Sequence, residues 1–333
     1  MIARPRNLPP PPDYPVEIGQ EDLAPYRQSD TGVDYVHSFE SGVPGPHAMV
    51  NALTHGNELC GMLVVKRLLD SGVRPVRGRL TFSLANVAAY ERFGPSRLDS
   101  RFVDRDFNRV WRDDLIDSDS ISTEAARARE LRPVVRSVDL LLDIHSTWHA
   151  LKPFFVLGNL PRARAFADRL GYPARQLFLP GVWHEGFHMI DYPPFRDPGG
   201  AAVGLIVECG QHFARSTAVT AFAAALRFLA VTEVIGEAEA TRLGAAPEPS
   251  EAIERYEIVE AVLAATDDFR LACSYAGFEV FPKGAIAAWD GQEPVRAPFD
   301  GAVVLPPRPA PKRGQQAFAW ARALTAGGPD PVF

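Results

Sequence analysis

Three short segments, far apart in the sequence, carry residue types that together could bind a catalytic metal ion: THGNE at 54–58, DIHST at 143–147 and VECG at 207–210. They offer two imidazoles and two carboxylates, which belong to His55, His145, Glu58 and Glu208. Two imidazoles and one carboxylate, with a fourth position left for water, are the ligands of a catalytic rather than a structural zinc. The remaining glutamate could deprotonate that water. The segments therefore predict a hydrolytic zinc site.

The surrounding pattern places these segments at the ends of strands. An apolar run at 47–54 is typical of a strand, and it gives way to helical periodicity at 57–72. Two further apolar runs, at 138–145 and 202–210, also read as strands. Open α/β sheets bind ligands at the ends of their strands, so we expect the three segments to meet at one edge of the sheet.

Asp143 lies two residues before His145 and hence on the same face of its strand. It could accept the second imidazole N–H and fix the tautomer of a metal ligand. The alternative is that His55 and His145 are independent polar residues at loop ends. His149, four residues after His145, is expected on a loop or in the pocket.

A different zinc motif competes with this one. Residues 184–188 read His-Glu-Gly-Phe-His, a literal H-E-x-x-H, and Glu208 follows at a spacing that suits a third ligand. That motif requires a helix, which would bring its two histidines onto one face. Here Pro-Gly at 180–181, Pro-Pro at 193–194 and the internal Gly186 leave barely three turns. We therefore expect a loop near the cleft.

An unusual density of planar donors lies between the first two metal segments. The segment 100–111, SRFVDRDFNRVW, contains Arg101, Arg105, Asp106, Asn108 and Arg109. Taken alone, it would be read as a solvated charged loop. Beside a zinc site, a guanidinium can stabilise the oxyanion of a tetrahedral intermediate. An Asn–Arg pair can hold a substrate carboxylate with forked hydrogen bonds.

Composition excludes several classes of protein. The net charge of −6 gives no support for binding to nucleic acid or to an anionic membrane. The three cysteines are scattered, which argues against a thiolate zinc site and a disulfide framework. No apolar run approaches 18 residues, and the Pro-rich start lacks the apolar segment of a secretory signal. We expect a cytoplasmic protein.

Strands alternating with helices predict an α/β fold with a mixed, largely parallel sheet. A helical pattern at 123–135 contains Pro133, which should kink it or begin a new segment.

The expected organisation has four parts. Residues 1–45 would form an N-terminal arm and first elements, and residues 46–236 a catalytic domain. The small, acidic and Pro-containing stretch 237–254 reads as a linker. In residues 255–333 short strand patterns punctuated by Gly and Pro predict a C-terminal β domain.

These motifs resemble, in the same order, those of the succinylglutamate desuccinylase/aspartoacylase family, relatives of the zinc carboxypeptidases. H-G-N-E at 55–58 and D-I-H at 143–145 are similar to its ligand motifs, and R-F-V-D-R-D-F-N-R at 101–109 to its substrate motif. V-E-C-G at 207–210 resembles the segment of its catalytic glutamate, and 297–307 looks like part of its C-terminal β domain.

The resemblance implies a carboxypeptidase-like sheet, one Zn²⁺ per chain and a role for each matching residue. The metal ligands would be His55, Glu58 and His145. Glu208 would act as general base and acid, and Arg101 would hold the oxyanion. Asn108 and Arg109 would bind the carboxylate of the substrate, while Asp106 would position the motif. The reaction implied is hydrolysis of a small anionic N-acyl amino acid, and a homo-oligomer is consistent with the family.

The chain departs from the family at two places that bear on the substrate. Aspartoacylases use a further arginine upstream of the catalytic glutamate, for which Arg196 is the nearby candidate although its spacing does not match. They also place a tyrosine from the C-terminal domain over the site, where this chain offers Phe318 and Trp320.

The alternatives to a deacylase are a zinc metallocarboxypeptidase or cell-wall peptide hydrolase, and a non-catalytic binding protein. The β domain favours the deacylase, and the presence of a general base argues against the binding protein.

Overall fold

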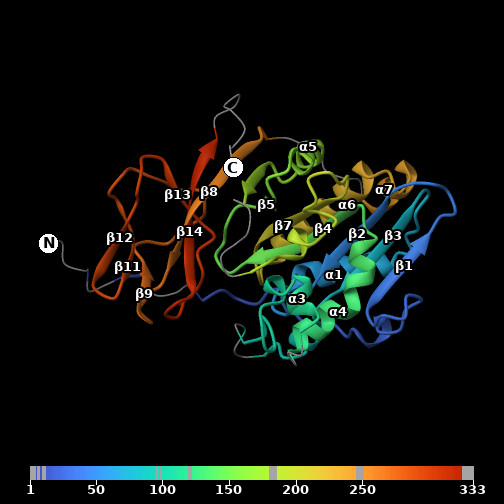
Figure 1. Ribbon diagram of the computed structural model, residues 1–333, viewed down its shortest axis with the longest axis horizontal. Helices are drawn as coiled ribbons and strands as arrows, with labels where there is room; N and C mark the ends of the chain where they lie inside the picture. Colours follow the sequence, from blue (N-terminus) through green and yellow to red (C-terminus); the bar gives the residue numbers. More distant parts are fainter. Residues whose placement is uncertain are drawn as a thin grey trace.

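The computed structural model describes residues 5, 8–9, 13–94, 97, 99–118, 122–179, 186–244 and 251–324. Figure 1 shows an α/β part, formed by the blue, green and yellow segments, beside a β-rich part formed by the orange and red segments. The predicted fold class is confirmed: a mixed α/β sheet with flanking helices is followed by antiparallel β structure.

One sheet of eleven strands runs through the described part of the chain, in the order β1-β3-β2-β4-β7-β5-β6-β8-β14-β13-β10. Its first seven strands along the chain are β1 (Val36–Glu40), β2 (His47–Ala52), β3 (Arg79–Leu84), β4 (Leu140–Thr147), β5 (Phe154–Leu157), β6 (Arg175–Phe178) and β7 (Val203–Gln211). The strands β3, β2, β4 and β7 are parallel, whereas β1 and β5 are antiparallel to β3 and β7. The carboxyl ends of β2, β4 and β7 therefore meet at one edge.

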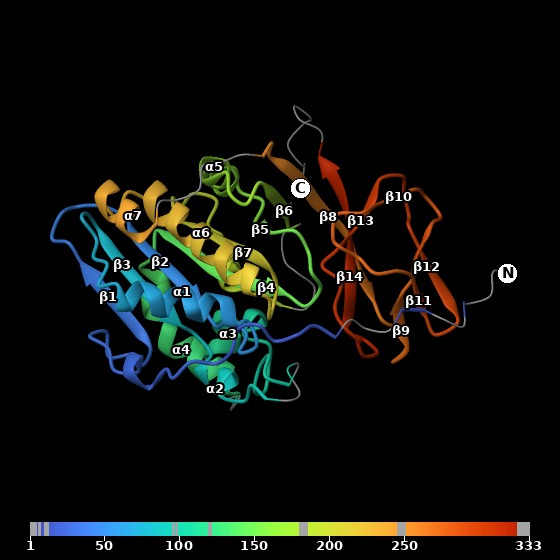
Figure 2. The same ribbon diagram turned by 180° about the vertical axis from the view of Figure 1, so that it is seen from behind.

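Helices cover both faces of this sheet. They are α1 (Leu59–Asp70), α2 (Val87–Tyr90), α3 (Asp113–Ile116), α4 (Thr123–Arg136), α5 (Pro161–Leu170), α6 (Arg215–Val231) and α7 (Glu237–Leu243), with 3₁₀ turns η1 (Ala24–Tyr26), η2 (Phe107–Arg109) and η3 (Met189–Asp191). Apolar side chains of α1, α5, α6 and α7 share one core cluster, on the face that Figure 2 shows in front. Side chains of α3, α4 and η3 share a second cluster on the opposite face.

Strand alternation decides which face receives the polar side chains. Ile144 on β4 and Val207 on β7 belong to the first core cluster, whereas Leu141 and Ile206 belong to the second. Because successive side chains point to opposite faces, the odd positions of β4 and the even positions of β7 share the face of the second cluster. The polar residues at 143, 145 and 208 therefore project from the same side of the sheet.

Of the two outcomes expected at Pro133, the start of a new segment is wrong, because one helix continues through this residue. α4 runs from Thr123 to Arg136 with Pro133 inside it, three residues before its end. The side chain of Ser122 accepts the N–H of Ala125 and caps the start of the helix. Proline removes one backbone hydrogen bond near the end of α4, while Leu131 and Val135 on either side are fully buried in the second cluster. We attribute the continuity of the helix to this packing.

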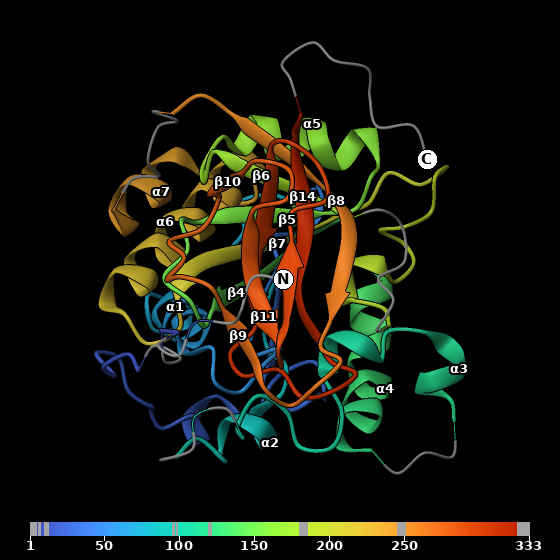
Figure 3. The same cartoon turned by 90° about the vertical axis from the view of Figure 1, so that its left-hand side faces the viewer.

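The C-terminal strands extend the main sheet and add a second one. They are β8 (Glu254–Leu263), β9 (Phe269–Leu271), β10 (Val280–Phe281), β11 (Ile286–Asp290), β12 (Glu293–Arg296), β13 (Ala302–Leu305) and β14 (Gln316–Leu324). β8 pairs with β6 and β14, so the hydrogen-bonded ladder continues from the α/β part into the β-rich part. β12, β11 and β9 form a three-stranded sheet. Figure 3 looks onto these strands, with helices of the α/β part around them.

The N-terminal segment connects the two parts (Figures 1 and 2). The Tyr14 hydroxyl accepts the N–H of Ala150, and the N–H of Glu17 donates to the carbonyl of Phe213.

α7 occupies the first half of the stretch predicted as a linker. The proposed domain boundaries stay a prediction. No helix in the described ranges combines the length and apolar character that a membrane crossing would need.

Candidate metal centre

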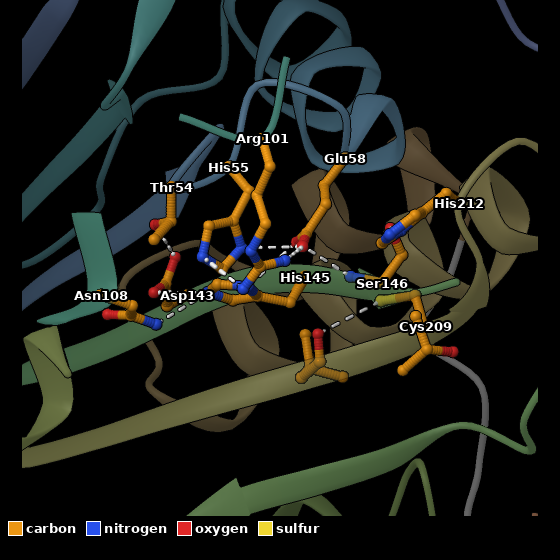
Figure 4. A network of polar contacts seen from close by, with 12 residues as sticks. Thr54, His55, Glu58, Arg101, Asn108, Asp143, His145, Ser146, Cys209 and His212 are labelled. Carbon is orange, nitrogen blue, oxygen red and sulfur yellow. Dashed lines mark hydrogen bonds and ion pairs between the residues drawn. The ribbon is translucent and has the colours of Figure 1, made fainter. Parts of the chain in front are cut away.

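The structure brings His55, Glu58 and His145 together at the carboxyl edge of the sheet (Figure 4). Their candidate ligand atoms all lie within 4.8 Å of one another. Nδ1 of His55 is 2.7 Å from Oε1 of Glu58, and Nδ1 of His145 is 2.9 Å from Oε2. All three residues are buried. The two Nδ1 atoms and the carboxylate thus face one another, as ligands of one ion would.

The electrostatics of the cluster favour a positive charge at its centre. Burial would raise the pKa of Glu58, but the charges of His55 and His145 hold it well below its usual range. Burial would lower the pKa of His145, but Asp143 and Glu58 raise it well above its usual value. Two imidazoles and a carboxylate are also donors that zinc prefers, so the residues fit a zinc ion.

A close approach of two backbones positions the first two ligands. A Cβ on Gly56 would lie 2.4 Å from the carbonyl carbon of Ala89 and 2.5 Å from the carbonyl oxygen of Ser100. The N–H of Gly56 donates to the carbonyl of Arg101 at 3.1 Å. Lack of space, rather than conformational freedom, therefore requires glycine between His55 and Glu58.

Each imidazole is oriented by a second carboxylate. Nε2 of His145 lies 2.8 Å from Oδ2 of Asp143, as its position on the strand predicted, and Nε2 of His55 lies 3.1 Å from Oδ1 of Asp106. The other oxygen of Asp143 accepts from Asn51 and Thr54 at 2.8 and 2.9 Å. These contacts leave both Nδ1 atoms available to a metal ion, and orienting a ligand in this way is the usual role of such carboxylates.

Glu208 lies beside the cluster without belonging to it. It is opposite His145 in the β4–β7 pairing, and its Oε2 atom is shielded from solvent and has no hydrogen-bond partner among the described residues. Burial, together with the charge of Glu58, raises the pKa of Glu208 to about 8, against the opposing charge of His145. A carboxylate so placed can exchange a proton near neutral pH.

The arginine motif lies across the metal cluster, as Figure 4 shows for Arg101. The guanidinium of Arg101 contacts Oδ2 of Asp106 at 3.1 Å, Nε2 of His55 at 2.9 Å and Oε1 of Glu58 at 3.4 Å.

Sequence reasoning missed the residue that shapes this loop. The buried carboxylate of Glu124, in the first turn of α4, accepts the backbone N–H groups of residues 103–105 at 2.6 to 3.1 Å. An acidic residue in the first turn of a helix was the available signal.

Asn108 and Arg109 lie between the cluster and the segment 186–191. Oδ1 of Asn108 accepts the N–H of Met189 at 2.8 Å, while its Nδ2 lies 3.5 Å from Nε2 of His145. A Cβ on Gly186 would be 2.7 Å from the carbonyl oxygen of Arg109, so the two segments are in direct contact.

Within the described part of the competing H-E-x-x-H motif, residues 186–188, the backbone is not helical. His184 and Glu185 lie outside the described residues, but Phe187 forms a parallel bridge with Val110 and His188 precedes η3 in an extended conformation. Nδ1 of His188 lies 2.7 Å from Oδ2 of Asp191, and the metal cluster found among the described residues does not include His188. The expectation of a loop holds for the described part of the motif.

The remaining candidates are spread around the site. Arg196 is exposed, and its guanidinium lies 5.4 Å from the centre of the Phe187 ring, so its role as a substrate ligand stays a prediction. Phe318 and Trp320 are buried in a third core cluster, which is formed by residues of the β-rich part. His149 lines a separate cavity.

Sequence reasoning also missed Ser146 and His212, which form a hydrogen-bonded chain with Glu58. The N–H of Ser146 donates to Oε2 of Glu58 at 3.1 Å, and its hydroxyl is 2.8 Å from Nδ1 of His212. Burial is the main reason that the pKa of His212 falls to about 3. The dipeptide Gln211-His212 follows an apolar run, and no local pattern in the sequence relates it to Ser146.

Known proteins resemble this chain in sequence and in structure. The sequence profile of the succinylglutamate desuccinylase/aspartoacylase catalytic domain matches residues 44–175, a range that includes the metal cluster and the arginine motif but ends before Glu208. The succinylglutamate desuccinylase of Vibrio cholerae is 24% identical over 301 residues, which are 86% of this chain and 83% of that protein. The N-acyl-aromatic-L-amino acid amidohydrolase (carboxylate-forming) of Xenopus tropicalis is 34% identical over 113 residues, 31% of this chain and 34% of that protein. The solved succinylglutamate desuccinylase of Vibrio parahaemolyticus has a TM-score of 0.65 at 19% identity and covers 88% of this chain and 87% of its own. This last likeness establishes a common fold.

Proposed function

Because the chain belongs to the succinylglutamate desuccinylase/aspartoacylase family, we propose that it hydrolyses the amide bond of a small N-acyl amino acid. The products would be a carboxylic acid and a free amine. The observation that carries the proposal is the buried His55–Glu58–His145 cluster with Glu208 paired beside it on the next strand.

The cluster would hold the metal ion, and Glu208 would transfer the proton. A zinc ion held by the three cluster residues would supply Lewis acidity and lower the pKa of a water molecule bound to it. Glu208 would take the proton from the attacking water and return it to the leaving nitrogen. The pKa of about 8 at Glu208 suits both transfers, because a group that titrates near the working pH can accept and release a proton with similar ease.

Arg101 is suited to bind the oxygen of the scissile carbonyl. Its guanidinium lies against Glu58 and His55, and its side chain remains 29% exposed and hence accessible to a substrate. The bond that it donates would strengthen as negative charge develops on that oxygen.

Asn108 and Arg109 would hold the carboxylate of the amino acid. Oδ1 of Asn108 is engaged by Met189, which turns the Nδ2 donor towards His145 and the cluster. An amide donor and a guanidinium from neighbouring residues can bind one carboxylate with forked hydrogen bonds.

Metal analysis tests the centre directly. We expect about one zinc per chain in the wild type, and its loss in His55→Ala, because a catalytic zinc has few protein ligands. The matched control is His47→Ala, since His47 is also buried and lies at the opposite end of β2, where it contacts Ser137 and Thr81. His188→Ala should also keep the metal. Zinc that persists in His55→Ala but is lost in His188→Ala would refute the proposed centre.

Substrate assays test the reaction. The zinc-loaded protein is incubated with N-acetyl and N-succinyl derivatives of acidic, aliphatic and aromatic amino acids, and the free amine is quantified. We expect release from at least one of these compounds and none from Glu208→Gln. Release only of C-terminal residues from longer peptides would favour a metallocarboxypeptidase and overturn the deacylase.

A further inference from the structure

A cavity of about 90 Å³ lies where three distant segments of the chain meet, apart from the metal cluster. Its wall is formed by the N-terminal segment with Tyr14, by His149 after β4, and by two stretches of the β-rich part, 269–275 and 308–311. None of the cluster residues, Glu208 or the arginine motif contributes to this wall. The cavity is therefore a feature of its own.

The charge of the wall is opposite to that of the molecule. The chain carries a net charge of −6, yet the described residues around the cavity include Arg270 and Arg308 and neither Asp nor Glu. Arg270 forms an ion pair at 3.6 Å with Asp268, which lies outside the wall. Two arginines in the wall of one small cavity favour an anion, since the planar fork of a guanidinium matches a carboxylate.

Neutral polar groups add donors beside the arginines. His149 is buried, and its Nε2 atom has no hydrogen-bond partner among the described residues. Burial lowers the pKa of His149 to about 4, so the imidazole is neutral at pH 7 and can donate one N–H. Tyr14 accepts the N–H of Ala150 through its hydroxyl oxygen, and this leaves its own O–H as a donor. A buried donor without a partner is costly, so a ligand that accepted its hydrogen bond would be favoured.

The rest of the wall is apolar. Phe269, Leu271 and the prolines at 309 and 311 line it. A water molecule needs roughly 10–15 Å³ of such space, so the cavity has room for a small molecule of several non-hydrogen atoms. We propose that this cavity binds a small organic carboxylate with an apolar body, whose carboxylate lies at Arg270 and Arg308.

The chain contains its own reporter for this site. Cys273 lines the cavity and is exposed, whereas Cys60 and Cys209 are buried. Alkylation of the native protein should therefore occur at Cys273, which peptide mass spectrometry can verify. Iodoacetate and iodoacetamide are a matched pair of reagents that differ in a negative charge, and glutathione supplies the ratio of their rates for a free thiol.

We expect the ratio of iodoacetate to iodoacetamide rates at Cys273 to exceed that of glutathione about 10-fold, because a cationic cavity concentrates an anionic reagent. Arg270→Gln and Arg308→Gln should each lower the ratio towards that of glutathione. Benzoate should slow alkylation by both reagents in the wild type and not in the double variant. The matched control is Arg322→Gln, on β14 and outside the wall, which should keep the wild-type ratio.

Two outcomes would overturn the proposal. One is a wild-type ratio equal to that of glutathione together with no protection by benzoate. The other is protection that survives in the Arg270→Gln/Arg308→Gln double variant but disappears in Arg109→Ala, since the anion would then bind at the proposed catalytic clamp. Neither outcome depends on turnover, so the failure of this proposal and the failure of the proposed function are distinguishable.

Discussion

Asp143 offers a sharp test of how the metal cluster is oriented. This carboxylate is fully buried, and its Oδ2 lies 2.8 Å from Nε2 of His145. The Oδ1 atom of Asp143 accepts hydrogen bonds from Asn51 and Thr54 at 2.8 and 2.9 Å. Asp143→Asn keeps the shape of the side chain and retains an oxygen that can accept these two bonds. The amide NH₂ then faces Nε2. To avoid two opposed donors, His145 must move its proton to Nδ1, the atom that faces Glu58 at 2.9 Å.

The proton would thus occupy the nitrogen that the metal needs. Loss of such an orienting partner typically weakens metal binding 10–100-fold, which corresponds to about 1.4–2.7 kcal/mol. Asp143→Ala is the poorer choice, because it removes the oxygen to which Asn51 and Thr54 donate, and an unsatisfied buried donor costs roughly 1–3 kcal/mol. Its effect on folding would obscure its effect on the metal.

The assay is competition for zinc with a chromophoric chelator at pH 7, with circular dichroism to verify folding. The matched control is Asp139→Asn, because Asp139 directly precedes the same strand and accepts the backbone N–H of His47 at 2.8 Å, far from the cluster. We expect a higher Kd for zinc in Asp143→Asn and an unchanged Kd in Asp139→Asn. An unchanged Kd in Asp143→Asn, or equal weakening in both variants, would refute the proposed orientation.

Three further predictions follow from the site. Glu208→Gln should keep the zinc content of the wild type and lose about 10²–10⁴-fold in kcat, and full activity in steady-state assays would exclude Glu208 as the base. Arg109→Lys should raise KM about 10-fold with a smaller change in kcat, because a lysine cannot make the forked contact; an unchanged KM would move the carboxylate clamp elsewhere. The pKa of His212 is lowered to about 3 in the fold, so only the unfolded chain takes up its proton as the pH falls below about 6.5. The free energy of unfolding should therefore fall by about 2.3 kcal/mol between pH 6.5 and pH 4.5 from this residue, and urea titrations of metal-free His212→Gln should lack that part of the slope; equal slopes in both proteins would contradict it.

Local patterns in the sequence were sufficient for the elements that carry the site. The strands that carry His145 and Glu208 and the helix after Glu58 form where periodicity predicted them, although β4 continues past His145 to Thr147. Alternation along β4 also placed Asp143 on the face of His145. These inferences succeed because a strand fixes the side of every side chain by a period of two.

Contacts between distant segments were beyond the reach of such patterns. The bond from Asp106 to His55 and the carboxylate of Glu124 under the arginine loop each join residues that no local period relates. The continuity of α4 through Pro133 depended on packing against the second core cluster. The wall of the cavity that includes His149 comes from both ends of the chain.

The sequence by itself determined the chemical groups of the candidate centre and the elements that present them, since residue types and short periods are local properties. Only the tertiary structure decided which nitrogen of each imidazole faces Glu58 and which carboxylate holds the other nitrogen. Those choices depend on where separate strands and loops come to lie beside one another, and that is settled by the packing of the whole core.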